Sequence, residues 1–527
     1  MIPSYVLPAL FLTACGPSGG SASDYTINLE PVVATNQPDL FDALDRLDLI
    51  FDAPGDDDLR VALGAPTSGS TLDAEALPPL ADTIVRVEGY AAGERVAWGQ
   101  TLPLSAEDGV VDVQVYVGRA SDAAWLGARP DGLLQTGLIA TGDGRFLVFG
   151  GVANGRNDLP TQVQDTYAAL TLAPPGDGLA FEELGALPEH TTTAGDASTQ
   201  RAWAAATRLS VAGSDAGKIL YFGGSSEDPY GGGLAVTSTS HLYDPATDAW
   251  EVLEARAQLT TPRARHLAIE NSVGNVVVWG GFAETDQANT YGWVDTFEMY
   301  DRAGRAFAEI GQASALGQIE AAAANLGTTG TLVCGGAELQ GGSPEFWASM
   351  DGCVRVANDG SSLTAVASLP ERLSGLAMVE LPDGRALASG GATRAAHADG
   401  GEAARTEAWV YEPDTDAWSF VGDMNVARAG HRLAALPDGR VLVVGGASTH
   451  DPFALTTDAL SCLELFDPST SAFTVLGGCD ETSDSVGLPG RSNGPAVAVD
   501  PVWGALIVGG SDGAGKAQSA VSLFLPE

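Results

Sequence analysis

The stretch "LAALPDGRVLVVGG", Leu433–Gly446, is the part of the chain that determines how the rest is interpreted. An apolar segment turns at a Pro-Asp-Gly sequence, continues as a run of aliphatic residues and ends in two consecutive glycines. A similar stretch, "MVELPDGRALASGG", occupies Met378–Gly391 and ends 55 residues earlier. Recurrence at a fixed period of this size indicates a repeated supersecondary unit.

Glycine pairs that follow apolar segments recur along most of the chain at similar intervals. The successive intervals are 73, 57, 55, 55, 55 and 64 residues. A single pair would mean little, whereas a series of this kind predicts one repeated unit for each pair. The pairs are Gly150-Gly151, Gly223-Gly224, Gly280-Gly281, Gly335-Gly336, Gly390-Gly391, Gly445-Gly446 and Gly509-Gly510.

A second landmark is a pair of aromatic residues seven positions apart. Tyr243 and Trp250 bound "YDPATDAW", and Tyr411 and Trp418 bound "YEPDTDAW". The residues between them supply Pro at the second position of a turn, with Asp and Thr to bond the turn backbone. The pattern therefore predicts a hairpin with one aromatic residue on each arm. A Ca²⁺ loop is the alternative for the Asp residues, but turn chemistry accounts for each of them.

A third landmark opens each unit. Arg263 and His266 lie in "PRARHLAIE", and Arg428 and His431 lie in "ARAGHRLAAL". Each sequence begins an apolar segment that runs to a short turn, after which the strand with the glycine pair follows. Each unit is thus expected to hold four antiparallel strands.

These three landmarks together resemble the kelch repeat of the galactose oxidase/kelch-like superfamily, whose fold is a β-propeller. The resemblance covers about residues 120–527 and is strongest around Gly223, Gly280, Gly390 and Gly445. It implies an all-β, seven-bladed propeller, with glycines where blades converge and aromatic rings between the sheets. The final unit stops at its third strand. The segment around Trp125 is therefore expected to supply its fourth strand and close the ring.

The sequence divides into four predicted segments. Residues 1–15 resemble a lipoprotein-type signal peptide, with Leu12-Thr13-Ala14-Cys15 similar to a bacterial lipobox, although no Lys or Arg precedes the apolar run. Residues 16–24 form a Gly/Ser tether, residues 25–118 a small β-sandwich-like domain, and residues 119–527 the propeller. We therefore expect a lipid anchor at Cys15. The expected location is the bacterial cell envelope, as an outer-membrane or cell-surface lipoprotein.

The composition limits the possible partners. The 527 residues carry a formal net charge of −42, with Lys218 and Lys516 as the only lysines. Such a surface repels phosphate backbones and so argues against nucleic acid. It indicates a solvated acidic shell, with Ca²⁺ capture by clustered carboxylates as the alternative. No other cofactor is expected, and membrane contact is expected through the lipid anchor only.

Four cysteines remain if Cys15 is acylated, and an even number in an exported protein suggests disulfides. Cys334 precedes a glycine pair and Cys353 opens the next predicted strand, whereas Cys462 and Cys479 flank a predicted hairpin. Local pairing within each couple is the simplest connectivity. No Cys-x-x-Cys spacing suggests zinc.

Long loops between the second and third strands are expected to share one face of the propeller. Long loops on a rigid scaffold are common binding sites. Aromatic residues among polar ones there could bind protein or sugar, or pack against one another to order the loops. The candidate residues on these loops are Tyr230, Trp293, Trp347, His397 and His450.

The arginine that opens each unit is the second candidate. An arginine ring around the central opening could receive a carboxylate or sulfate. The alternative is pairing with Asp or Glu inside the repeat array. The residues concerned are Arg201, Arg263, Arg372, Arg428 and Arg491, with Arg129 in the degenerate first unit.

The expected function is that of a monomeric, non-catalytic scaffold that binds a protein or glycan through the long-loop face. The alternative is a carbohydrate-active enzyme or lectin, similar to sialate mutarotases, that recognises an acidic sugar at the arginine-lined opening. Six scattered histidines give no cluster for the copper of galactose-oxidase-like proteins. No nucleophile elbow, phosphate loop or zinc motif occurs, so no catalytic residue is predicted.

Overall fold

The structure is a computed structural model. It describes residues 10–14, 26–32, 40–53, 58–66, 71–74, 83–100, 112–119, 122–128, 136–142, 144–153, 162–172, 179–193, 195–213, 215–227, 235–284, 291–339, 347–394, 402–451, 458–476, 488, 494–501 and 504–526. Over these ranges the protein is all-β and contains no α-helix, as the glycine and aromatic landmarks predicted. No helix in these ranges is long and apolar enough to cross a membrane.

Four-stranded antiparallel sheets follow one another from residue 137 to residue 525. The first three sheets are β10 (Gly137–Ala140), β11 (Arg145–Phe149), β14 (Thr166–Leu172) and β15 (Leu179–Ala186); β18 (Ala205–Arg208), β19 (Ile219–Phe222), β20 (Ser240–Asp244) and β21 (Ala249–Val252); and β22 (Leu267–Glu270), β23 (Val276–Trp279), β26 (Thr296–Asp301) and β27 (Ala306–Gln312).

The next three sheets repeat the same order. They are β28 (Ala322–Asn325), β29 (Thr331–Cys334), β32 (Cys353–Val356) and β33 (Leu363–Val366); β34 (Ala377–Glu380), β35 (Ala386–Ser389), β37 (Glu407–Glu412) and β38 (Ala417–Asp423); and β39 (Arg432–Ala435), β40 (Val441–Val444), β42 (Leu463–Asp467) and β43 (Ala472–Leu476).

The last sheet joins both ends of the repeat region. It contains β44 (Ala496–Asp500), β45 (Gly504–Val508) and β46 (Ala520–Leu525), and β46 pairs with β9 (Asp122–Ala128). Its fourth strand thus comes from residues that precede the first sheet, in the segment where the sequence analysis expects a closing strand.

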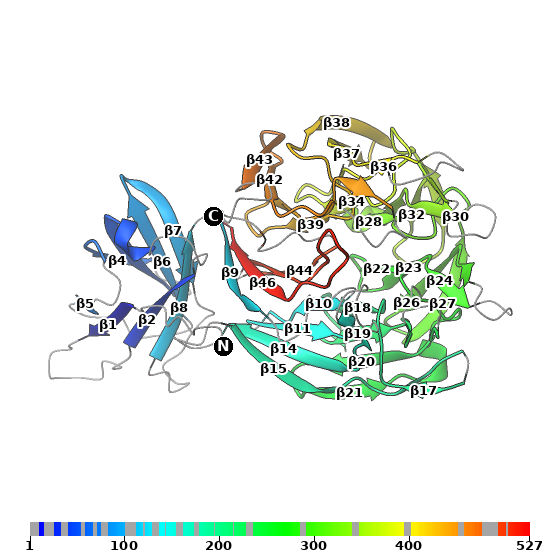
Figure 1. Cartoon of the computed structure of the whole chain (residues 1–527), viewed down its shortest axis with the longest axis horizontal. Coiled ribbons are helices and arrows are strands. Elements are labelled where there is room, and N and C mark those ends of the chain that lie inside the picture. The colour runs from blue at the N-terminus through cyan, green and yellow to red at the C-terminus, as the bar shows by residue number, and fades with distance from the viewer. Residues whose placement is uncertain are drawn as a thin grey trace.

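The first strands of the sheets surround the middle of this part of the molecule, and the last strands lie at its outside (Figure 1). Each first strand contacts the first strand of the next sheet, and β44 contacts β10 again. The second strands are buried along their whole length, as in β23 and β40, whereas outer strands such as β21 and β43 are largely exposed. This gradient explains the aliphatic run before each glycine pair and gives a propeller-like arrangement.

The glycine pairs end the second strands where neighbouring sheets converge. Gly280 and Gly281 have φ values of 70° and 97°, in the left-handed region that only glycine adopts without cost. A Cβ atom on Gly280 would lie 2.0 Å from the carbonyl oxygen of Gln318 in the next sheet. Both the backbone conformation and the close approach therefore require glycine at this position.

The aromatic pairs join the third and fourth strands. The ring centroids of Tyr243 and Trp250 are 5.0 Å apart, and those of Tyr411 and Trp418 are 5.2 Å apart. The hydroxyl of Tyr411 donates to Oδ1 of Asp416, at 2.8 Å, in the turn between them. The turn carboxylate of Asp416 thus accepts a hydrogen bond from the first aromatic residue of the hairpin. Within the described ranges, no group of three potential metal-ligating side chains occurs.

Strands from the N-terminal region form one eight-stranded sheet, in the order β4 (Leu59–Leu63), β3 (Arg46–Asp52), β6 (Ile84–Ala91), β7 (Glu94–Gln100), β8 (Asp112–Arg119), β2 (Thr26–Val32), β1 (Leu10–Ala14), β5 (Thr71–Ala74). β1 belongs to the segment predicted as a signal peptide. Leu49, Val87 and Val117 share one buried cluster although their strands are not all adjacent, so the sheet bends around its core. The small sandwich-like domain stays a prediction.

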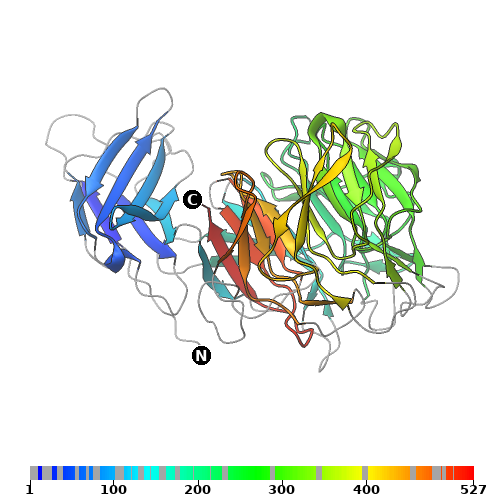
Figure 2. The same cartoon turned by 90° about the horizontal axis from the view of Figure 1, so that it is seen from above.

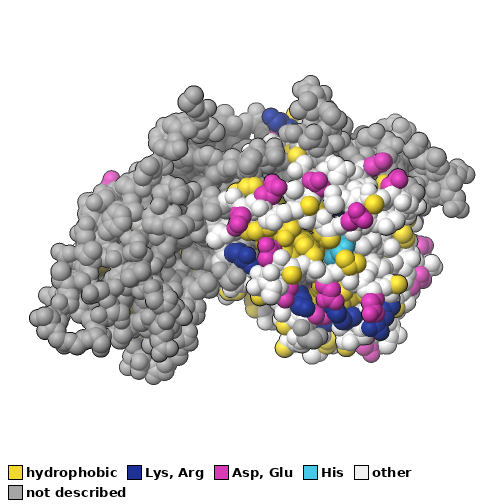
Figure 3. All heavy atoms as spheres, turned by 90° about the horizontal axis from the view of Figure 1, so that it is seen from below, with side chains coloured by type: hydrophobic (Ala, Val, Ile, Leu, Met, Phe, Trp, Pro, Cys, Tyr) yellow, Lys and Arg dark blue, Asp and Glu magenta, His cyan; other side chains and the backbone are white. Residues whose placement is uncertain are grey.

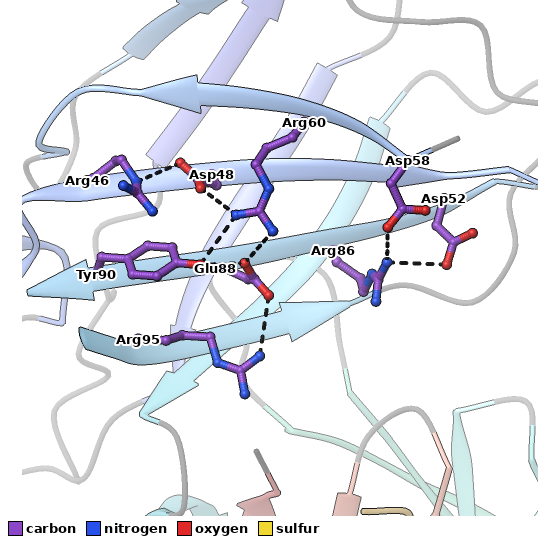
Figure 4. A network of polar contacts seen from close by, with 9 residues as sticks. All are labelled: Arg46, Asp48, Asp52, Asp58, Arg60, Arg86, Glu88, Tyr90 and Arg95. Atoms are coloured by element: carbon purple, nitrogen blue, oxygen red, sulfur yellow. Dashed lines mark hydrogen bonds and ion pairs between the residues drawn. The ribbon is translucent and has the colours of Figure 1, made fainter. Parts of the chain in front are cut away.

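The opposite face of β3, β4, β6 and β7 carries a network of polar side chains (Figure 4). Arg60 reaches Oδ2 of Asp48 at 2.6 Å and Oε2 of Glu88 at 3.0 Å, and Arg86 reaches Oδ2 of Asp58 at 2.7 Å. Positive and negative side chains therefore pair with each other across strands, as expected of a solvated sheet face.

The N-terminal strands lie as a unit beside the propeller-like part (Figure 2). The indole Nε1–H of Trp98, on β7, donates to the backbone carbonyl of Pro526, next to the C-terminal strand β46.

One predicted disulfide is confirmed. Cys334 ends β29 and Cys353 begins β32, the two residues are directly opposite in the ladder, and a disulfide joins them. Cys462 is disulfide-bonded as well, whereas Cys479, its predicted partner, lies outside the described residues.

Candidate functional site

Two of the arginines that open the repeats form buried ion pairs with glutamates. The Nη2 group of Arg263 pairs with Oε1 of Glu298, and that of Arg428 pairs with Oε1 of Glu464 at 2.7 Å. All four side chains are fully buried. Each arginine precedes the first strand of a sheet and each glutamate lies on the third strand of the same sheet. Each pair is therefore buried within one repeat and does not face an opening.

The other predicted arginines differ from one another. Arg201 is also fully buried, beside His241 and Tyr221. Arg372 is exposed, with Nε 3.9 Å from Oδ1 of Asp351. The bridges Ser374–Ala392 and Ala429–Ala447 show that Leu373, and not Arg372, is the equivalent of Arg428. Arg129 and Arg491 lie outside the described residues.

Two of the loop candidates come together, and the others do not. Trp347 is buried, and its ring centroid lies 6.1 Å from that of His450. Trp293 packs instead on Phe282, at 4.7 Å between ring centroids. Of the two alternatives for these tryptophans, packing within the loops describes them better. The remaining candidates, Tyr230 and His397, lie outside the described residues.

Short two-stranded ribbons carry these loop residues. β24 (Phe282–Glu284) pairs with β25 (Tyr291–Trp293), and β30 (Ala337–Leu339) pairs with β31 (Trp347–Ser349). β36 (Glu402–Ala403) pairs with β41 (Thr449–His450), so loops from two consecutive sheets are joined where His450 lies.

A different repeat position brings charged side chains together. Trp203, Arg265, Glu320, Gly375 and Gly430 each lie two residues after the position of the repeat arginine, and all five have positive φ, from 53° to 66°. Backbone hydrogen bonds connect them from sheet to sheet. The N–H of Arg265 donates to the carbonyl of Trp203, that of Gly375 to Glu320, and that of Gly430 to Gly375. We call these five residues the ring position.

Three of these residues adopt a conformation that normally favours glycine. Trp203, Arg265 and Glu320 have φ values of 53°, 56° and 57°. A residue with a side chain is destabilised in this region by about 1–2 kcal/mol. Because the chain uses glycine at the same position in other repeats, the side chains of Arg265 and Glu320 are retained against the backbone preference. Such strain concentrates at functional sites.

The ring position is completed by a histidine from the loops. The Nε2–H of His450 donates to Oε2 of Glu320 at 2.7 Å, and Nη2 of Arg265 pairs with Oε1 of the same carboxylate. A Cβ atom on Gly375 would lie 2.7 Å from Cε1 of His450. The glycine at this repeat therefore leaves the space that the imidazole occupies.

Arg432, the first residue of β39, adds a second positive charge to this group. Its side chain keeps exposed surface, whereas desolvation by the surrounding protein lowers its pKa; Glu320 opposes this shift and Arg265 adds to it. No ion pair of Arg432 is found in the described part of the chain. We call Arg265, Glu320, Arg432 and His450 the ring cluster.

The electrostatics of the ring cluster keep Glu320 ionised. Burial alone would raise the pKa of this carboxyl, but His450 and Arg265, and more weakly Arg432, lower it to about 2. Such a carboxylate cannot act as a general acid at neutral pH. It accepts hydrogen bonds from the side chains around it. The cluster holds two guanidinium groups, of which Arg265 pairs with Glu320, for one carboxylate. It therefore has positive charge left to bind an anion, and the planar donors of Arg432 suit a carboxylate.

Sequence reasoning missed Arg265, Glu320 and Arg432. A signal for the first two was present. In aligned repeats, Arg265 and Glu320 stand where Gly375 and Gly430 stand, and charged residues at a position that is otherwise glycine indicate a special role. Arg432 carries no comparable signal in the sequence.

One side of the described surface has a mixed charge. Figure 3 shows basic side chains next to acidic ones on that face, with hydrophobic side chains between them. Arg305, for example, pairs with Glu251 at 2.8 Å and with Asp215 at 3.3 Å, so a basic side chain lies next to acidic ones.

Comparisons with known proteins concern the fold. No protein-family model matches the chain, and no curated protein matches it. Solved structures of 379 protein chains resemble it. One of them, described as "Structure of YjhT", has 16% sequence identity, covers 66% of this chain and 99% of its own, and gives a TM-score of 0.43.

Proposed function

We propose that this chain binds a carboxylate-bearing ligand of the acidic-sugar class at the central opening of a propeller. The ring cluster is the observation that supports the proposal. It combines Arg265 and Arg432 with a single ionised carboxylate, Glu320. The backbone of Arg265 and that of Glu320 both adopt a strained conformation with positive φ. Arg432 is the ligand's expected partner, because it is exposed and has no described ion pair.

The fold proposed around this opening is a seven-bladed kelch-type propeller. The repeated four-stranded sheets, the contact of β44 with β10 and the pairing of β46 with β9 support it. Export and a lipid anchor at Cys15 remain proposals from the sequence.

A protein- or glycan-binding scaffold is the second candidate. The pairing of β36 with β41 supports it, because this pairing joins the loops of two neighbouring sheets into one ordered surface. A macromolecular partner on that surface would contact the loops around His450 without needing the positive charge of Arg432.

A thermal-shift comparison tests the proposal. A Cys15→Ser form of the full chain is heated with galacturonate or with neutral galactose, and with glucuronate or glucose. Saturating ligand raises the free energy of unfolding by about 2.7 kcal/mol at one hundred times its dissociation constant. The proposal expects a shift with the acids only and a smaller shift in Arg432→Gln. Equal shifts with acid and neutral sugar would favour a different sugar site.

A further inference from the structure

A second positively charged group lies inside the second sheet. Arg201 is fully buried, its Nη1 lies 3.4 Å from Nδ1 of His241 on β20, and its guanidinium carbon lies 5.0 Å from the ring centre of Tyr221 on β19. His190, which begins β16 (His190–Thr191), is buried too and is close enough for Arg201 to affect its titration.

The other repeats show what this group lacks. Arg201, Arg263 and Arg428 occupy the same repeat position. His241 precedes Tyr243 by two residues, as Glu298 precedes Tyr300 and Glu464 precedes Phe466. The second sheet therefore has a histidine where two other sheets have the carboxylate that neutralises the arginine.

The charge of the group is that of Arg201 alone. Burial, and then the charge of Arg201, lower the pKa of both His190 and His241 to about 3, so both rings are neutral at pH 7. Burial lowers the pKa of Arg201 to about 10, against a weaker opposing effect of Tyr221, and the guanidinium stays charged. The face of the Tyr221 ring stabilises part of this charge through a cation–π contact.

Several donors of the group have no acceptor. Nε and Nη2 of Arg201 and both ring nitrogens of His190 make no hydrogen bond to any part of the described chain. A buried donor without an acceptor destabilises the folded state, and an uncompensated buried charge does so more strongly. The aromatic contact satisfies neither N–H group of the guanidinium.

We propose that Arg201, with His190 and His241, binds a small monovalent anion such as chloride. The anion takes the place of the Glu298 and Glu464 carboxylates, accepts from Nε and Nη2 of Arg201 and neutralises its charge.

The test uses the full chain, and the other repeats suggest the substitution to make. Thermal unfolding is measured in sodium chloride and in sodium gluconate at equal ionic strength. We expect chloride to raise the midpoint by about 2 °C or more and to saturate. In His241→Glu, which reproduces the neighbouring sheets, the midpoint in gluconate should rise and the chloride effect should vanish. His241→Gln, which adds no charge, should keep the chloride effect.

Two results would overturn the proposal. One is a wild-type midpoint that does not differ between the two salts. The other is a chloride effect of equal size in His241→Glu, because the salt would then act elsewhere. Should His241→Glu fail to fold, crystals of the wild-type chain in bromide provide a direct readout. An anomalous peak beside Arg201 supports the site, and its absence at saturating bromide contradicts it.

Discussion

Nε2 of His450 lies 2.7 Å from Oε2 of Glu320, although the two residues are 130 positions apart in the sequence. The contact connects a loop ribbon of the sixth sheet to the ring position of the fourth. It is possible because Gly375, between them in the ring, has no side chain to occupy the space. The loops and the centre of the molecule thus form one site.

Glu320 should make stability depend on pH below 4.5. Its folded pKa of about 2 is below its ordinary value of 4.5. The carboxylate therefore contributes stability above pH 4.5, about 3 kcal/mol in size, which is lost as the pH falls from 4.5 toward 2. In urea unfolding, Glu320→Gln should be less stable than wild type at pH 6, and the difference should shrink below pH 4.5. A difference that is constant with pH would rule out this role.

Removing the strained charged pair should preserve the fold. The double variant Arg265→Gly/Glu320→Gly places glycine where Gly375 and Gly430 already stand, and relieves about 1–2 kcal/mol at each residue. This gain offsets the lost ion pair, so urea unfolding should show a stability equal to or above that of wild type. Acidic-sugar binding should be lost. A variant several kcal/mol less stable would show that the two side chains serve the fold.

The buried pair Arg263–Glu298 should behave differently from the ring cluster. Glu298→Leu leaves a buried guanidinium without its carboxylate, which should cost about 3–5 kcal/mol in urea unfolding. The double variant Arg263→Leu/Glu298→Leu should recover most of this loss, because the fifth sheet has Leu373 and Trp409 at the same two positions. Equal losses in the single and double variants would contradict a charge-based explanation.

Buried histidines should make the protein sensitive to acid. Burial, then Arg263, lowers the pKa of His266 to about 3, whereas in the unfolded chain it is 6.5. Between these values only the unfolded chain takes up the proton, so stability falls as the pH is lowered, by about 1.4 kcal/mol per pH unit. Another repeat has leucine, Leu376, at the position of His266. The variant His266→Leu should therefore fold, and its free energy of unfolding should change with pH between pH 6 and pH 4 less steeply by that amount. An unchanged slope would contradict the assignment.

The fold could be predicted from local patterns, and the site could not. The glycine pairs and the Tyr411–Trp418 pair report geometry within a few residues, so they predicted an all-β chain of hairpins. The disulfide of Cys334 and Cys353 followed for the same reason.

The candidate site depends on two properties that spacing does not encode. One is the direction of a side chain: Arg263 turns into its own sheet, whereas Arg265, two residues later, reaches Glu320 in the next repeat. The other is contact between distant segments, as between His450 and Glu320. The frame of the repeat also shifts by one residue near Arg372, where Leu373 takes the arginine position.

Calorimetric titration of galacturonate and galactose into the wild-type chain and Arg432→Gln tests the central claim most directly. The account predicts that wild type binds the acid and not the neutral sugar, and that Arg432→Gln binds the acid at least tenfold more weakly, about 1.4 kcal/mol, with unchanged unfolding. Equal affinity of the two proteins for galacturonate, or no acid binding by wild type, would contradict a carboxylate site at the ring cluster.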